Sequence, residues 1–129
     1  EHDDFNLHLK LYENIDIALD TFPYNGVTTT FEALWKGVPV ITMYGYNFNS
    51  RCGSSILKNA NLEYLIAADE QDYVNKVLSL SENFENLNKL RKKIFDEILI
   101  SPLFDNHTFA KHFYGHLLKV YNKYFQDLE

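Results

Sequence analysis

The sequence predicts an α/β fold in which a short parallel sheet is flanked by helices and followed by long helices. Three apolar runs, each long enough for one buried strand, alternate with segments of helical periodicity. The runs span residues 15–19, 38–43 and 62–67. Strands that alternate with helices along a chain are typical of parallel sheets, because a parallel pair needs a crossover connection.

Two helices are predicted between these strands. The first spans residues 28–35 and ends before Gly37, a residue type that commonly follows a helix C-terminus. Its predicted apolar face carries Phe31, Leu34 and Trp35. The second helix follows a polar and aromatic loop and spans residues 51–59.

The rest of the chain is predicted to be helical, over residues 69–80, 82–99 and from Asp105 to about residue 125. In the second of these helices, four apolar residues share one face: Leu87, Leu90, Ile94 and Ile98. The last helix is apolar or aromatic almost all round, which is typical of a helix buried on every side. We expect one side to pack on this domain and the other on protein outside the sequence, or on a second copy of the chain in a homodimer.

The composition limits the classes of protein that fit. The chain has 129 residues, enough for one domain with a core, and a formal net charge of -6, which argues against a nucleic acid partner. No apolar run is long enough for a bilayer and no signal peptide is recognisable, so we expect no membrane contact. Cys52 is the only cysteine, which fits a reducing compartment and predicts a cytoplasmic location. Three strands form a thin sheet for a doubly wound domain, so residues 1–129 are expected to be a single, truncated domain.

The most informative segment runs from Asn25 to Thr30, between the first strand and the first helix. The Asn25-Gly26 pair predicts a sharp reversal with positive φ, and the three threonines are predicted to occupy the N-cap to N3 positions. The first N–H groups of a helix lack intrahelical partners, and the helix dipole favours negative charge there by about 0.3–1 kcal/mol. The segment therefore predicts a site for a phosphate-bearing ligand. The alternative is a helix capped by its own threonine, although three threonines exceed what capping needs.

Two further residues are candidates for binding a nucleotide. Glu32 lies one turn after the threonines, where a carboxylate is able to accept hydrogen bonds from a ribose diol. A first-turn carboxylate that only complements the helix dipole fits the sequence equally well. His8 precedes the first strand and is able to stack on a base, although a surface histidine is the simpler interpretation.

The sequence offers no catalytic or metal-binding set. No Ser/His/Asp or Cys/His arrangement has support from its local context, so no catalytic residue is assigned to this chain. His112 and His116 are spaced i, i+4, but no glutamate lies between them, and we expect no metal site.

Five ordered blocks of the sequence resemble the C-terminal catalytic lobe of the O-linked N-acetylglucosamine transferases, especially their bacterial members. The blocks are His8-Leu9-x-Leu11-Tyr12, Asp16 to Pro39, Ser50-Arg51-x-Gly53-x-Ser55-x-Leu57, Glu63-Tyr64-Leu65-Ile66-Ala67 and Ser101-Pro102-Leu103-Phe104-Asp105. Their order and spacing make this resemblance far more specific than a single motif.

The resemblance implies part of a glycosyltransferase-B architecture, in which two Rossmann-like lobes face each other across a cleft. This chain would be the C-terminal lobe, which binds the UDP-sugar donor. Six residues match donor-binding positions of the family: His8, Lys10, Val27, Thr28, Thr29 and Glu32. By this resemblance Thr28 and Thr29 hold the diphosphate and Glu32 holds the ribose hydroxyls. His8 would lie against the uracil, and the segment around Lys10 would border the nucleotide.

The resemblance also implies a reaction, the inverting transfer of N-acetylglucosamine from UDP-GlcNAc to Ser or Thr of an acceptor protein. No cofactor or metal is expected, because a helix N-terminus would stabilise the departing diphosphate. Full-length members carry helical repeats and an N-terminal lobe with the proposed base, and both lie outside this sequence. The isolated fragment is therefore expected to be inactive.

Two departures from the family pattern stand within the site. Val27 occupies a position where relatives often carry histidine or threonine, and Glu32 replaces an aspartate that is common in animal members. Three other functions stay open on the sequence. They are a nucleotide-sugar binding module without transfer activity, a related two-lobed enzyme such as a UDP-sugar epimerase, and a purely structural partner domain.

Overall fold

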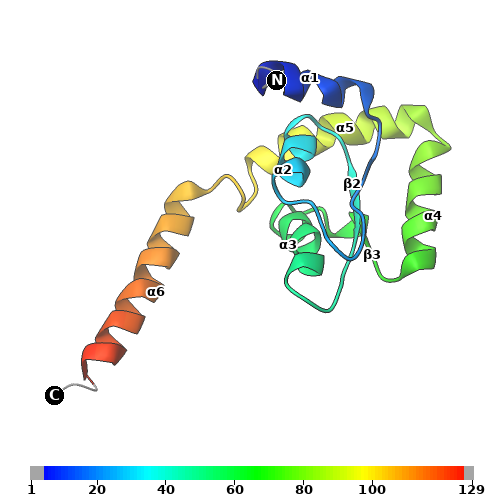
Figure 1. Cartoon of the computed structure of the whole chain (residues 1–129). Helices are drawn as coiled ribbons and strands as arrows, with labels where there is room; N and C mark the ends of the chain where they lie inside the picture. Colours follow the sequence, from blue (N-terminus) through cyan, green and yellow to red (C-terminus); the bar gives the residue numbers. More distant parts are fainter. Residues whose placement is uncertain (1–4, 127–129) are drawn as a thin grey trace.

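Among the described residues, three parallel strands form the centre of the structure, as the sequence predicts for an α/β fold (Figure 1). They are β1 (Ala18–Leu19), β2 (Val40–Met43) and β3 (Ile66–Ala67), in the order β1-β2-β3. Ala18 pairs with Val40 and Thr42 pairs with Ile66, both in parallel register. The structure is a computed structural model, and it describes residues 5–126.

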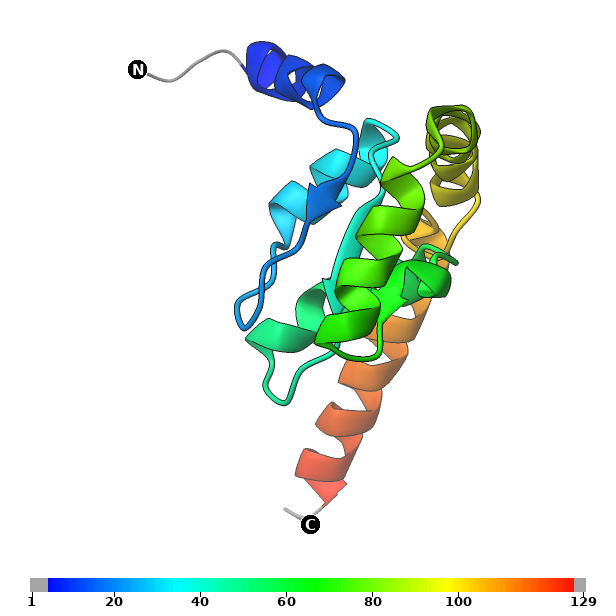
Figure 2. The ribbon, with the colours of Figure 1, turned by 90° about the vertical axis from the view of Figure 1, so that its right-hand side faces the viewer.

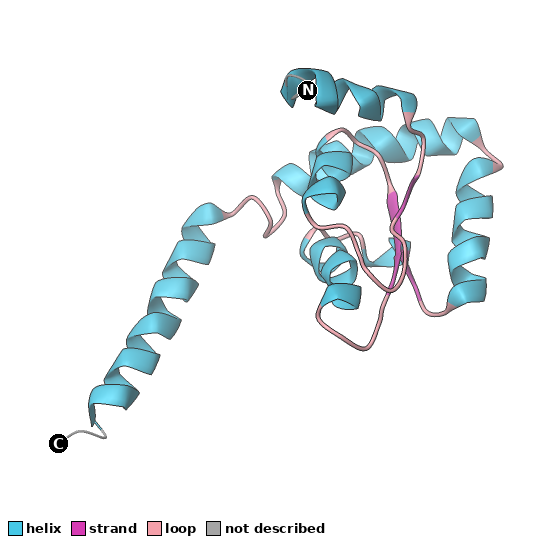
Figure 3. Cartoon of the chain, viewed as in Figure 1, coloured by secondary structure: helices cyan, strands magenta, loops and turns pink. Residues whose placement is uncertain are grey.

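Helices cover both faces of this sheet. Within the described residues they are α1 (Phe5–Lys10), α2 (Thr28–Trp35), α3 (Cys52–Asn59), α4 (Glu70–Ser81), α5 (Phe84–Leu99) and α6 (Asn106–Gln126). The α2 and α3 helices lie on one side of the strands and α4 lies on the other, while α5 packs against both α2 and α4 (Figure 1 and Figure 3). This arrangement directs the start of α2 to the edge of the sheet at which β1 ends.

The strands are shorter than the apolar runs that predicted them. The run at residues 62–67 begins as a 3₁₀ turn, in which the Leu65 N–H donates to the Leu62 carbonyl at 3.0 Å. Only Ile66 and Ala67 then pair in the sheet. Leu62 and Leu65 are nevertheless at most 2% exposed, so these two residues of the run belong to the core although they are not in a strand.

The core lies between the sheet and the helices (Figure 2, where α4 lies in front of the sheet). Its fully buried side chains come from strands, helices and the connections between them: Leu34, Val38, Ile41, Leu57, Leu62, Ile94 and Ile98. The predicted apolar face of α5 is confirmed, because Leu87, Ile94 and Ile98 are at most 2% exposed and Leu90 packs against the same cluster.

The α2 helix has the predicted bounds but buries a different face. Leu34 is buried as predicted, whereas Phe31 and Trp35 are each 41% exposed. Thr30 and Ala33 are buried instead. Their small side chains let α2 pack closely against β2, which leaves the larger side chains at the rim of the contact.

The α6 helix projects away from the rest of the structure (Figure 1 and Figure 2). Its side chains from residue 106 to 125 are exposed, apart from the half-buried Gly115. The expectation that this domain would cover one side of the last helix is therefore wrong. The connection at residues 100–105 redirects the chain, so the large apolar surface of α6 has no cover within the described residues.

Gly37 is a position at which the fold requires glycine. Its φ is +70°, and a Cβ there would lie 2.7 Å from the backbone oxygen of Arg91 in α5. Because both the backbone angle and the close approach exclude a side chain, Gly37→Ala should destabilise the protein by about 1–3 kcal/mol. Urea denaturation of the purified chain measures this change.

Gly115→Ala is the matched control for that substitution. A Cβ at Gly115 meets nothing within 4 Å and lies in an exposed helix, so this change should not lower the free energy of unfolding. Equal stability of the Gly37→Ala protein and the parent would contradict the packing of α5 against the loop after α2.

Candidate functional site

A solvent-open cavity of about 510 Å³ lies where β1 ends and α2 begins. Residues 18–21 and 24–30 form most of its wall, and Tyr12, Ala33 and Val40 complete it. The carboxyl ends of parallel strands are the usual location of ligand sites in open α/β sheets. The cavity therefore occupies the place at which the sequence predicts a ligand.

The first turn of α2 is not capped by a side chain. Val27 occupies the N-cap position and makes no side-chain capping bond, and the first backbone bond runs from the Phe31 N–H to the Val27 carbonyl at 3.1 Å. The three threonines consequently occupy N1 to N3, one position later than predicted. By contrast, Asp69, Asn83 and Asp105 cap α4, α5 and α6, each by accepting a hydrogen bond from an N–H three residues on. The amides at the start of α2 are therefore free to bind an anion.

The reversal before α2 differs from the predicted one. Within the described residues, positive φ occurs at Gly37 and Asn61, so the prediction of positive φ at Asn25-Gly26 is wrong. Glycine is required at position 26 for a close approach instead. A Cβ there would lie 2.5 Å from Thr29 Oγ1 and 3.0 Å from Thr30 Oγ1. The missing side chain allows two threonine hydroxyls to pack against the loop.

A buried carboxylate forms the floor of this loop, and the sequence analysis did not single it out. Asp20 is 6% exposed, and its two oxygens accept hydrogen bonds from the Gly26 N–H at 2.7 Å and from Thr42 Oγ1 at 2.6 Å. Burial raises the pKa of Asp20, and these two hydrogen bonds oppose that rise. The available signal was an acid at the end of a strand, directly before an Asn-Gly pair.

Asn25 is a second residue whose place the sequence did not reveal. It is 1% exposed and lines the cavity, and its Oδ1 accepts a hydrogen bond from the Gly53 N–H at 3.3 Å. Its Nδ2 is buried and has no hydrogen-bond partner among the described residues. An unpaired buried donor costs about 1–3 kcal/mol, which a ligand oxygen would offset by accepting from it.

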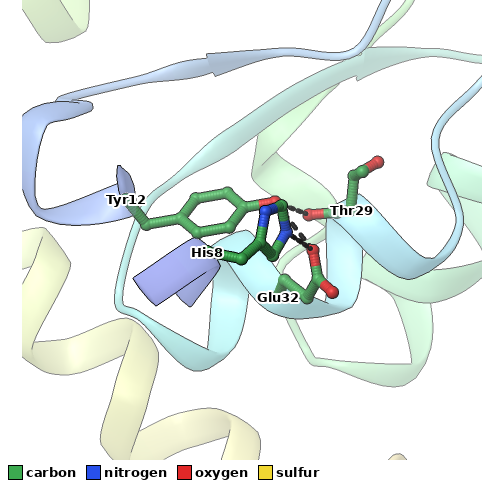
Figure 4. A network of polar contacts seen from close by, with 4 residues as sticks. All are labelled: His8, Tyr12, Thr29 and Glu32. Carbon is green, nitrogen blue, oxygen red and sulfur yellow. Dashed lines mark hydrogen bonds and ion pairs between the residues drawn. The ribbon is translucent and has the colours of Figure 1, made fainter. Parts of the chain in front are cut away.

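Glu32 belongs to a network that joins α1, the 3₁₀ turn after it and α2 (Figure 4). Its Oε2 lies 3.0 Å from the Tyr12 hydroxyl, which donates to it, and 3.0 Å from His8 Nε2. The Tyr12 hydroxyl is also 3.4 Å from the Thr29 carbonyl. The structure thus brings His8 and Glu32 together beside the first turn of α2, and Tyr12, which the sequence reasoning missed, holds them there.

The two remaining predicted residues lie differently. Val27 is 46% exposed and lines the cavity, and it also borders a smaller hollow formed with Phe31 and Phe48. Lys10 is the exposed last residue of α1 and, like His8 and Glu32, is not among the described residues that line the cavity. Arg51 donates to the carbonyls of Gly45 and Tyr46, so it organises the loop after β2.

Two general features complete the description of residues 5–126. These residues contain no group of three or more His, Cys, Asp or Glu placed to hold a metal ion. None of their helices combines the length and apolar character that crossing a membrane requires.

An α/β domain with a free helix start at the carboxyl edge of its sheet is an arrangement typical of nucleotide-binding proteins. The chain belongs to Glycosyl transferase family 41, whose sequence model matches residues 6–113. It is 37% identical over 117 residues to the probable UDP-N-acetylglucosamine–peptide N-acetylglucosaminyltransferase SPINDLY of Solanum lycopersicum, a match that covers 91% of this chain. A UDP-N-acetylglucosamine–peptide N-acetylglucosaminyltransferase of Caenorhabditis elegans is 33% identical over 98 residues, or 76% of this chain. The resemblance stated from the sequence is confirmed.

A solved structure of a mutant O-GlcNAc transferase from Thermobaculum terrenum has the same fold over 98% of this chain. The TM-score is 0.87 and the sequence identity is 31%. The chain spans 24% of that solved chain and 13% of the Solanum lycopersicum relative. Most of each relative therefore lies outside the matched region.

The alkaline limit of stability tests the placement of Tyr12. Burial, followed by the hydrogen bond to Glu32 and the charge of Glu32, raises the pKa of Tyr12 from 10.0 to about 12. Because the folded state holds this proton more tightly than the unfolded state, the stabilisation is complete below a pH of about 10 and is lost as the pH rises through about 12. Tyr12→Phe should therefore show a weaker loss of stability over this pH range, measured by urea denaturation.

Tyr24→Phe is the control, because it removes a hydroxyl from a side chain that is 71% exposed. It should keep the pH dependence of the parent protein. An unaltered pH dependence in Tyr12→Phe would mean that the hydroxyl is not held against Glu32.

Proposed function

We propose that this chain is the C-terminal, donor-binding part of an inverting protein O-glycosyltransferase, which transfers N-acetylglucosamine from UDP-GlcNAc to Ser or Thr. One observation carries the proposal: the uncapped first turn of α2 opens into a cavity at the carboxyl end of β1. The unpaired, buried Nδ2 of Asn25 beside the same cavity supports it. The names of the family 41 relatives supply the donor and the kind of acceptor.

The diphosphate of the donor would rest on the first turn of α2. The amides of Val27, Thr28 and Thr29 and the two threonine hydroxyls are the donors for its oxygens. No lysine or arginine occurs among the described residues that line the cavity, and Asp20 is the only carboxylate there. Amide N–H groups and the helix dipole would therefore neutralise the phosphate charge, without a cationic side chain in the cavity wall.

The nucleoside would extend from this turn toward α1. The Glu32 side chain is 14% exposed, and its Oε2 is held by Tyr12 and His8, so the carboxylate would be oriented for its other oxygen to accept from the ribose hydroxyls. His8 would lie against the uracil, held in place by its contact with Glu32. Lys10, two residues after His8 at the end of α1, would border the nucleotide on its solvent side.

In the proposed reaction, negative charge would develop on the departing diphosphate beside the first turn of α2. The bond between the anomeric carbon and the β-phosphate oxygen breaks while an acceptor hydroxyl forms a bond on the opposite face, which inverts the configuration. The departing diphosphate gains negative charge, and preorganised N–H donors stabilise it without a metal ion. The base that accepts the hydroxyl proton would come from an N-terminal lobe, so this fragment would be inactive alone.

The proposal includes the setting of the longer protein. The complete protein would contain the second lobe of a glycosyltransferase-B fold and helical repeats, and the single cysteine fits a cytoplasmic location. Donor binding alone would also fit a nucleotide-sugar module without transfer activity or a related two-lobed UDP-sugar enzyme. Sugar transfer to a protein acceptor by the longer protein separates these alternatives.

Removing the two threonine hydroxyls tests the diphosphate site. The double change Thr28→Ala and Thr29→Ala should weaken UDP binding by about 1–3 kcal/mol, because two donors to a charged group are lost. Isothermal titration of the chain with UDP measures the difference.

Thr108→Ala is the control, because Thr108 lies at the start of α6, where Asp105 already caps the helix. It should leave UDP affinity unchanged. If the double variant binds UDP as tightly as the parent protein, Thr28 and Thr29 do not contact the diphosphate.

The exposed apolar surface of α6 predicts that the isolated chain forms a homodimer. Phe113 and Leu117, which are 56% and 52% exposed, lie one turn apart on this helix. Association buries such surface, so sedimentation equilibrium should show a dimer whose population grows with concentration. Changing both residues to Glu should shift the equilibrium to monomer, whereas Lys119→Gln should not. A parent chain that stays monomeric at high concentration would contradict this prediction.

A further inference from the structure

We propose that Asp20 is a positioning residue of the donor site, whose carboxylate fixes the loop before α2 so that the first amides of this helix face the cavity. The inference rests on the proposed function, because it names a residue that prepares the same site. Asp20 acts on the ligand through the loop and does not bind the ligand itself.

The first step is the bond between Asp20 and the loop. Oδ1 accepts from the Gly26 N–H at 2.7 Å, across six residues of chain. Gly26 directly precedes Val27, the N-cap residue of α2. Because this bond turns the Gly26 N–H inward onto Asp20, the orientation of the next peptide groups is set from inside the protein.

The second step is the anchoring of the carboxylate. Oδ2 accepts from Thr42 Oγ1 in β2 at 2.6 Å, and both groups are buried. Gly53 in α3 leaves the space for this pair, since a Cβ there would collide with Asp20 Oδ2 and Thr42 Oγ1. The Tyr73 hydroxyl in α4 also donates to the backbone carbonyl of Asp20 at 3.3 Å. The carboxylate is therefore anchored to β2, and the backbone of the same residue is anchored to α4.

Asn25 also attaches the loop through hydrogen bonds, but these do not involve Gly26. The Asn25 N–H donates to the Asn49 carbonyl at 3.1 Å, and Asn25 Oδ1 accepts from the Gly53 N–H at 3.3 Å. Among the described residues, Asp20 is thus the one whose side chain binds the N–H of Gly26, the residue directly before the N-cap of α2.

The charge of Asp20 indicates positioning rather than ligand contact. No ion pair joins it to a lysine, arginine or histidine within the described residues, and it lies in the wall of the cavity. A carboxylate in contact with a diphosphate would repel it. If Asp20 and Thr42 served stability alone, two apolar side chains in their positions would cost less free energy than a buried charge. The carboxylate instead supplies two hydrogen-bond acceptors, one for the Gly26 N–H and one for the Thr42 hydroxyl.

Three variants separate positioning from a general loss of stability. Asp20→Asn keeps an oxygen acceptor for Gly26, and its amide is able to donate to the Thr42 hydroxyl, so UDP affinity should stay within about threefold of the parent. Asp20→Ala removes the acceptor and should weaken UDP binding by about tenfold or more, since a loosened loop no longer presents the amides. Thr42→Val removes the other partner of the same carboxylate but keeps its bond to Gly26, so it should lower stability while weakening UDP binding much less than Asp20→Ala does.

The measurements are UDP titration, urea denaturation and the amide resonances of Gly26, Thr28 and Thr29 without ligand. Asp20→Ala should shift these resonances away from their positions in the parent protein. In Asp20→Asn and Thr42→Val they should stay close to the parent positions. If Asp20→Ala does not fold, Asp20→Ser replaces it, because serine is too short to reach Gly26 and should show the same loss.

Several results would overturn the inference. One is an Asp20→Ala protein that binds UDP as tightly as the parent. Another is an Asp20→Asn protein that binds UDP as weakly as Asp20→Ala. A third is a UDP affinity that falls in step with the free energy of unfolding in every variant, Thr42→Val included. Failure of the parent chain to bind UDP would instead reject the proposed function. The ligand-free resonances would then still test whether Asp20 sets the start of α2.

Discussion

The unsatisfied first turn of α2 is the feature on which the proposed function of this domain depends. A helix start with three free N–H groups is costly to bury and is normally capped, as the starts of α4, α5 and α6 are. In α2 the N-cap is a valine without a side-chain acceptor, and the turn opens into a cavity at the end of β1. Hydrogen bonds hold the surroundings of this turn in place. Asp20 accepts from Gly26 in the loop before the turn, and the Tyr12 hydroxyl donates to Glu32 beside it.

The fold was predictable because its signals are local. The bounds of α2 were predicted correctly from residues 28–35, and Gly37 ends this helix with the positive φ that its residue type allows. The strands were located but overestimated in length, since apolar runs report burial and not pairing. The direction of α6 was not predictable, because periodicity shows that a helix has an apolar surface and does not show what covers it.

A cavity lies where the sequence predicts the candidate site, but only part of the construction of this cavity was predictable. Thr28, Thr29 and Val27 lie at the cavity as their place in the sequence indicates. The contacts that organise them join residues far apart in the chain, such as Tyr12 with Glu32 and Asp20 with Thr42. No local pattern encodes such pairs, so the sequence indicated Glu32 as a candidate for ligand binding without revealing its hydrogen bond to Tyr12.

The most direct measurement is a titration of the ¹⁵N-labelled chain with UDP, followed through the amide resonances of Val27 to Thr30. The resonances of Glu70 and Gln71, at the capped start of α4, serve as the internal reference. The account predicts saturable shifts at the start of α2 and none at α4. Unchanged resonances at α2 up to millimolar UDP, or equal shifts at both helix starts, would contradict it.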